Sequence, residues 1–259
     1  ITAMTVMMLA DRGALSLDDP LSRFFPELSY ADSVQIRHLL THTSGIPDYY
    51  DREWFHPGMT NARVLQALLA APQLDFPPGS QYAYSNSAYV LLSMITEKAA
   101  GRSFREFVQQ EIFDPLGMAQ SVVYDETQPV IPNRAIGFDS AGKVDDYNAF
   151  TTGGGGIFSN VPDMLKWERA LYTDQLVSPE MLRQAYASTP LSNGALSHYG
   201  FGWRIDPDRP WVLHSGSLAG FRTFLWRDLE AQEMMLFLTN NTNTELETLS
   251  GELHSLWHP

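Results

Sequence analysis

One stretch in the first half of the chain most constrains the fold, because a turn, a polar loop and a helix follow one another there. A Pro-Pro-Gly turn at residues 77–79 ends the preceding element. An apolar helix is predicted from about Ser87 to Ala100. Tyr84 and Asn86 therefore lie two residues apart at a helix start, where two polar side chains can converge on one substrate. The alternative is a polar helix entry with no further role.

The composition restricts the classes of protein to consider. A chain of 259 residues suits one large domain or a catalytic unit with two lobes. The net charge of -13 argues against nucleic-acid and anionic-membrane partners, since both need a basic face. The sequence contains no cysteine, which excludes disulfides and thiol catalysis. No apolar run approaches the roughly 18 residues of a membrane span.

The order of the predicted elements indicates an α+β fold. Helices are expected through the middle of the chain, including a short one that ends at Gly45 and another over residues 102–113. Small strands are expected within residues 130–147, and the later part of the chain changes to strand-like sequence. Residues 221–226 and 233–239 predict a hairpin across residues 228–232, preceded by strands at residues 200–205 and 211–214. A last amphipathic helix is expected over residues 245–257.

The first twelve residues predict a buried helix, because they are apolar on nearly every face. Arg12 and Gly13 end this helix. No capping residue precedes it, and the first residue is Ile1, not methionine. We therefore expect the chain to be a fragment that lacks an upstream segment.

Several patterns suggest metal or cofactor chemistry without completing it. His38 and His42 are four residues apart, but Leu39 stands where a zinc helix would carry glutamate, and no third ligand is evident. The glycine run at residues 153–156 lacks the lysine of a phosphate-binding loop and predicts closely packed backbone. We expect neither a metal nor a cofactor.

Further motifs follow the Tyr84-Ser85-Asn86 triplet in a defined order. A glycine-rich loop comes next, and then His214-Ser215-Gly216-Ser217 at the end of a predicted strand. With these motifs the chain resembles the serine β-lactamase and penicillin-binding-protein family, in the branch of class C β-lactamases, D-alanyl-D-alanine carboxypeptidases and related esterases. The resemblance covers the whole chain and also rests on residues 15–20, 36–45, 115–118 and 154–157.

The resemblance implies a β-lactamase/transpeptidase-like domain over residues 1–259 that lacks its first strands. A helical lobe is expected at roughly residues 31–190, and an α/β lobe at roughly residues 1–30 plus 191–259. The family's nucleophile is the serine of a Ser-x-x-Lys motif, which would precede Ile1. The one such string in the chain, at residues 140–143, is expected in a turn. This chain by itself is therefore expected to be inactive.

The resemblance also assigns roles to the site residues. Tyr84 would relay a proton as general base and then acid. Asn86 would orient the substrate's amide, and the backbone N–H of Ser217 would form part of an oxyanion hole. His214 stands where many relatives carry lysine, so an ester or peptide substrate is favoured over efficient β-lactam hydrolysis. Ser215 and Gly216 complete the substrate-binding edge.

Two functions remain open at this point. The first is a serine hydrolase that forms an acyl-enzyme with an ester, a D-amino-acid peptide or a β-lactam. The second is a non-catalytic binding or scaffold member of the same fold. The partner implied by the first is a small-molecule or peptide substrate. The family resemblance favours a periplasmic or extracellular location, and the sequence does not define an oligomeric state.

Overall fold

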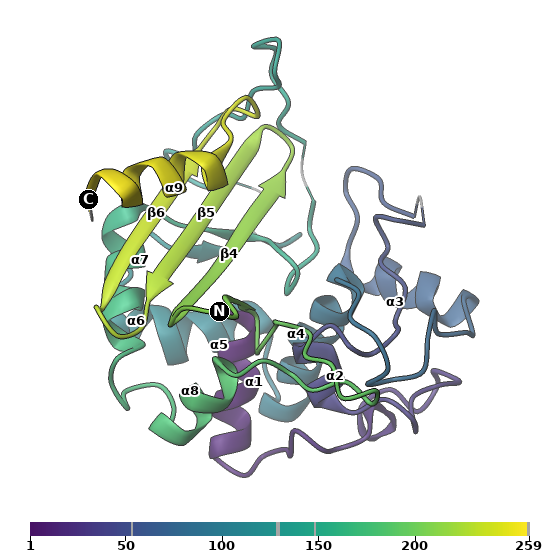
Figure 1. Ribbon diagram of the computed structural model, residues 1–259. Helices are drawn as coiled ribbons and strands as arrows, with labels where there is room; N and C mark the ends of the chain where they lie inside the picture. The colour runs from purple at the N-terminus through teal and green to yellow at the C-terminus, as the bar shows by residue number, and fades with distance from the viewer. Residues whose placement is uncertain (53, 128–129, 148, 258–259) are drawn as a thin grey trace. The chain divides into compact units, whose positions relative to one another are not determined.

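The structure, a computed structural model, describes residues 1–52, 54–127, 130–147 and 149–257 (Figure 1). The chain divides into two compact units. Unit 1 contains residues 1–130 and 149–202, and unit 2 contains residues 131–148 and 203–259. The predicted α+β class is confirmed, since helices and antiparallel strands both occur.

Unit 1 is mainly helical. Its longest helix is α4, which spans Asn86–Ala100. The other helical segments are α1 (Thr2–Asp11), η1 (Leu21–Arg23), α2 (Ile36–Leu40), α3 (Asn61–Ala70), α5 (Phe104–Val108), the π-helical turn η2 (Gln109–Phe113), α6 (Asp114–Leu116), α7 (Val161–Ala170) and α8 (Pro179–Ala185).

Helix α4 is the centre of this unit, because α1, α2, α3 and α5 all pack against it. It begins and ends where the sequence predicts. The Ser85 hydroxyl accepts the backbone N–H of Ala88 and so caps the first turn. Gly101 adopts the left-handed conformation, φ +69°, and ends the helix. The start of α4 is therefore fixed by local chemistry as well as by packing.

Helix α1 confirms the expectation of a buried helix at the start of the chain. Its residues from Thr2 to Leu9 are buried, and its N-terminal residue makes no side-chain cap. The Thr5 hydroxyl bonds to the Thr96 hydroxyl of α4 at 2.8 Å, so the polar atoms at this contact are paired.

The glycine run lies against α4 as closely as the sequence suggests. A β-carbon on Gly153 would lie 2.1 Å from the carbonyl oxygen of Tyr89, and Gly153 has φ +94°. A β-carbon on Gly154 would lie 3.2 Å from that of Asn86. By contrast, a β-carbon on Gly155 would meet nothing within 4 Å. Strand β2 (Ile157–Phe158) follows this run directly and pairs antiparallel with β1 (Val122–Val123).

We predict that Gly153→Ala lowers the free energy of unfolding by about 2–4 kcal/mol, because it adds both backbone strain and a clash with Tyr89. Gly155→Ala is the matched control and should change it by less than about 0.5 kcal/mol. Urea denaturation of both variants measures the difference. Equal stabilities for the two variants would contradict the close packing of this run.

Unit 2 contains an antiparallel sheet in the order β3-β4-β5-β6. Its strands are β3 (Arg204–Ile205), β4 (Trp211–Leu218), β5 (Phe221–Asp228) and β6 (Glu233–Thr239). The hairpin predicted across residues 228–232 is confirmed, because Asp228 pairs with Glu233. Strand β4 runs four residues beyond its predicted end at His214, since β5 pairs with it as far as Leu218.

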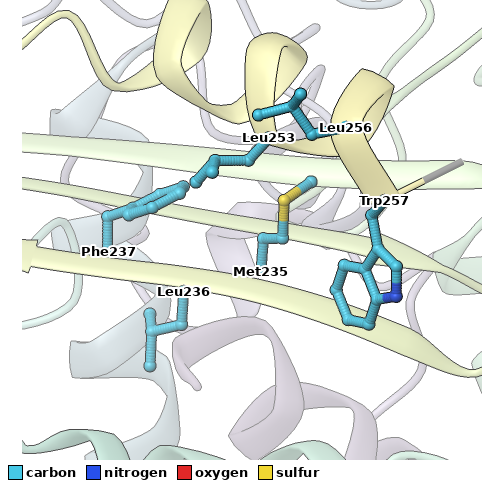
Figure 2. Close-up of a pocket in the computed structure, with 6 residues that line it drawn as sticks. All are labelled: Met235, Leu236, Phe237, Leu253, Leu256 and Trp257. Atoms are coloured by element: carbon cyan, nitrogen blue, oxygen red, sulfur yellow. The ribbon is translucent and has the colours of Figure 1, made fainter. Parts of the chain in front are cut away.

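Helix α9 (Leu246–Trp257) covers one face of this sheet, as the amphipathic pattern predicts. Phe224, Trp226, Met235 and Leu246 form the core between them. An apolar groove remains between β6 and the end of α9 (Figure 2). Met235 and Phe237 point toward the helix and Leu236 points away, as alternation along a strand requires.

Three expectations about local structure need correction. The helix expected to end at Gly45 is only the short α2, because the chain turns at Thr41 and continues in a left-handed residue, His42. The helix expected over residues 102–113 is broken into α5 and a π-helical turn. Small strands were expected within residues 130–147, where the described residues form only isolated bridges.

The division by internal contacts also differs from the expected lobes. Residues 1–30 belong to the helical unit, because α1 packs against α4. Residues 131–148 belong to the unit that contains the four-stranded sheet. The lobe boundaries given above for the family domain stay a prediction.

Candidate functional site

Tyr84 lies in the loop directly before α4, and 37% of its surface is exposed. Its ring packs on the imidazole of His42, with 4.1 Å between ring centroids and 34° between the planes. The ring of Tyr199 is oriented edge-on to that of Tyr84, with 6.4 Å between the ring centroids. The phenol is thus supported on its inner side and open to solvent on part of its surface. This position suits a group that exchanges a proton with a bound molecule.

Asn86 is the first residue of α4, and a buried carboxylate fixes it. Asp48 Oδ2 accepts the backbone N–H of Asn86 at 2.9 Å and its side-chain Nδ2–H at 2.7 Å. Because Nδ2 donates to Asp48, the carboxamide orientation is defined. Burial raises the pKa of Asp48, while the hydrogen bonds from Asn86 and Tyr50 oppose that shift.

The triplet is therefore held at both of its ends within unit 1. The backbone of Gly154 lies close to Asn86, since a β-carbon on Gly154 would be in tight contact with the Asn86 side chain. Sequence reasoning missed Asp48, which lies 38 residues before Asn86. No local pattern could have indicated this contact, since it depends on how the loop after Gly45 folds over the start of α4.

Strand β4 of unit 2 carries the second set of predicted site residues, His214, Ser215, Gly216 and Ser217. They pair with Leu225, Phe224, Thr223 and Arg222 of β5, in that order. Within unit 2, β3 pairs with β4 only at Val212 and Leu213. Residues 214–217 therefore form an edge of the described sheet, and edge strands carry backbone groups that can bind an extended ligand.

Gly216 has a packing role on this strand, because a β-carbon there would lie 2.4 Å from the Thr223 hydroxyl. Burial lowers the pKa of His214 below its usual range, and the nearby Arg204 acts in the same direction. The imidazole is accordingly neutral at neutral pH.

The predicted site residues thus form two sets, one in each unit. Tyr84 and Asn86 are brought together at the start of α4, and residues 214–217 are brought together on β4. The convergence of the two sets on one substrate stays a prediction.

The histidines considered as metal ligands have other partners. His38 Nδ1 accepts the backbone N–H of Gln35 at 3.1 Å, at the start of α2. His42 Nδ1 accepts the backbone N–H of Ser85 at 3.0 Å. They do not share a helical face, since α2 ends at Leu40. His42 therefore also contacts the Tyr84-Ser85-Asn86 triplet, beyond the turn that follows α2.

The Ser-x-x-Lys string at residues 140–143 lies in a turn, as expected. Lys143 is exposed there, and its backbone N–H donates to Asp139. An exposed lysine in a turn is not activated as a base by burial. Among the described residues, no helix has the length and apolarity needed to cross a membrane.

The chain matches the family described as Beta-lactamase over residues 1–253. It belongs to that family of serine hydrolases, which confirms the resemblance and the β-lactamase/transpeptidase-like fold class. Penicillin-binding protein 4* of Bacillus subtilis is 32% identical over 99% of this chain and 62% of its own length. D-aminopeptidase of Gluconobacter oxydans is 29% identical over 80% of this chain and 41% of its own length.

Esterase EstB of Burkholderia gladioli is 28% identical over 98% of this chain and 77% of its own length. Among solved structures, the octameric penicillin-binding protein homologue from Pyrococcus abyssi superposes with a TM-score of 0.80 and 28% identity, over 94% of this chain and 60% of that one. The chain spans 41–64% of the length of the first three curated relatives that it matches.

The lowered pKa of His38 generates a prediction about pH. Burial and the neighbouring Arg37 lower the pKa of His38 from 6.5, while Asp18 opposes the shift. The folded state therefore favours the neutral ring, whose contribution to stability is present above pH 6.5 and is lost as the pH falls through the folded pKa. His38→Asn should keep an acceptor for Gln35 and reduce this acid sensitivity.

The measurement is the free energy of unfolding at pH values from 7 to 5 for the wild type and for His38→Asn. The wild type should lose more stability than the variant over this range. The same dependence in both proteins would show that His38 does not contribute to it.

Proposed function

We propose that the full-length protein is a serine hydrolase that acts through an acyl-enzyme on an ester, a D-amino-acid peptide or a β-lactam. In this proposal the attacking serine belongs to a Ser-x-x-Lys motif encoded before Ile1. Tyr84 accepts the proton of that serine and returns it to the leaving group, and Asn86 orients the substrate's acyl-side amide. The observation that carries the proposal is that the partly exposed phenol of Tyr84 lies two residues from Asn86, whose carboxamide is held by Asp48.

The β4 edge supplies the second half of the proposed site. The backbone N–H of Ser217 would stabilise the oxyanion together with that of the serine. Ser215 would contact the polar end of the substrate. A neutral His214 adds a hydrogen-bonding group without a permanent positive charge, which favours esters and peptides over β-lactams. Relatives named as a D-aminopeptidase and an esterase support this preference.

The alternative is a non-catalytic member that uses the same fold to bind a ligand. The chain carries its one Ser-x-x-Lys string in a surface turn, and this observation supports the alternative. The residues encoded upstream of Ile1 discriminate between the two. A Ser-x-x-Lys motif there favours the hydrolase, and its absence favours the binding protein.

Covalent labelling tests the enzyme directly. A fluorophosphonate or a fluorescent penicillin should label the full-length protein, because an activated serine attacks both probes. Tyr84→Phe should slow labelling by about 100-fold or more, the usual loss when a general base is removed. The 259-residue chain by itself should stay unlabelled. Full-length protein that stays unlabelled and hydrolyses no p-nitrophenyl ester would exclude the hydrolase.

A change at residue 214 tests the proposed substrate preference. His214→Lys introduces an amine that is cationic when it pairs with a carboxylate, so kcat/KM for peptides with a free carboxylate should rise relative to that for neutral esters. The expected change in this ratio is about fivefold to tenfold, which corresponds to about 1 kcal/mol. His56→Lys, at an exposed loop position in unit 1, adds the same charge elsewhere as the control. An unchanged ratio would place His214 outside the substrate-binding edge.

A further inference from the structure

The two residues that flank Tyr84 both donate their backbone N–H to one residue, His42. The backbone N–H of Ala83 donates to the carbonyl oxygen of His42 at 3.0 Å. The backbone N–H of Ser85 donates to Nδ1 of the same residue, also at 3.0 Å. The residue before Tyr84 and the residue after it are thus fixed to a single point of the scaffold.

The imidazole of His42 also supports the phenol of Tyr84 through ring contact. The ring centroid of Tyr84 lies 4.1 Å from that of the imidazole. The ring centroid of Tyr89, on α4, lies 4.7 Å from it, with 24° between the two ring planes. Two rings cannot occupy one face at these distances, so the imidazole is sandwiched between them. Tyr89 is itself anchored, because its hydroxyl donates to the carbonyl oxygen of Leu40 at 2.8 Å. The stack connects Tyr84 to the core helix of unit 1.

The backbone of His42 shows that this arrangement is imposed by its surroundings. Its φ is +54°, a left-handed conformation that is uncommon outside glycine, and its side chain is only 1% exposed. Such conformations persist where the neighbouring structure over-determines them, and they concentrate at functional sites. Because Nδ1 accepts the Ser85 N–H, the neutral ring carries its proton on Nε2.

We propose that His42 is the positioning residue for Tyr84. It holds the backbone on both sides of the tyrosine and packs beneath its ring, and so fixes the direction in which the phenol points. This inference rests on the proposed function, since the proton transfer that it serves is the one assigned to Tyr84. The contacts of His42 with residues 83–85, which we call the His42 clamp, can be tested without measuring enzymatic activity.

Two substitutions at residue 42 separate the hydrogen bond from Ser85 to the side chain from the ring contact with Tyr84. Asparagine tolerates the left-handed conformation and places Oδ1 about where histidine places Nδ1, so His42→Asn should keep the Ser85 bond and lose the stacking. His42→Leu should lose both. His38→Leu is the matched control, because His38 also accepts a backbone N–H through Nδ1, at Gln35.

The first readout is structural and uses the full-length protein with ¹³Cζ-labelled tyrosine, where Tyr84→Phe assigns the resonance. In His42→Asn the Tyr84 resonance should shift while the Ser85 amide keeps its protection from hydrogen exchange. In His42→Leu the Ser85 amide should exchange about tenfold faster or more. In His38→Leu both signals should match the wild type. An unshifted Tyr84 resonance in His42→Asn overturns the proposal, even if His42→Leu does not fold.

The second readout is kinetic. His42→Asn should lower kcat for ester hydrolysis by about tenfold and leave KM within about twofold, since a mispositioned proton-transfer group slows the chemical step more than it weakens binding. An equal kcat in folded His42→Asn and wild type overturns the positioning role. If the full-length protein shows no activity, the proposed function fails, and the resonance and exchange data alone decide whether the clamp exists.

Discussion

The burial of α4 is the constraint on which unit 1 depends. Four helices pack against it, so its first residue cannot move without disturbing the core. The Ser85 cap fixes where the helix begins, and the Asp48 carboxylate holds the peptide and the amide of Asn86. A polar triplet at the start of this helix therefore gains the rigidity of the whole unit. A helix cap usually contributes about 1 kcal/mol to stability, which is small beside the contribution of the packing around α4.

The arrangement around Tyr84 joins two different physical requirements. In the proposed function the phenol must reach a ligand, which its exposed part allows, and must keep one direction, which its packed part provides. His42 and Asp48 approach the triplet from the preceding loop region on either side of Gly45. The segment from α2 to Asp48 thus brings two side chains to the start of a later helix, and α2 also contributes Ile36, Leu39 and Leu40 to the core.

Much of this fold could be predicted from local sequence. The Ser85 cap, the left-handed Gly101 and the hairpin at residues 228–232 each follow from residue types at fixed positions. The left-handed His42 and its bond to Ser85 could not be predicted, because they join residues 43 positions apart. The same holds for the close approach of Gly153 to Tyr89, where the sequence indicates tight packing but not its partner. Residues 214–217 lie farther inside a strand than their sequence suggests, since pairing with β5 extends β4.

The outer edge of β6 has a consequence for handling the protein. Among the described residues of unit 2 this strand pairs only with β5, and after Glu233 it carries no charged residue. Leu238 on the strand and Leu256 and Trp257 on α9 are exposed. Long apolar strand edges without charges template the addition of further chains. Recombinant material of this length should therefore be prepared at low concentration and checked for self-association by light scattering before any spectroscopic comparison.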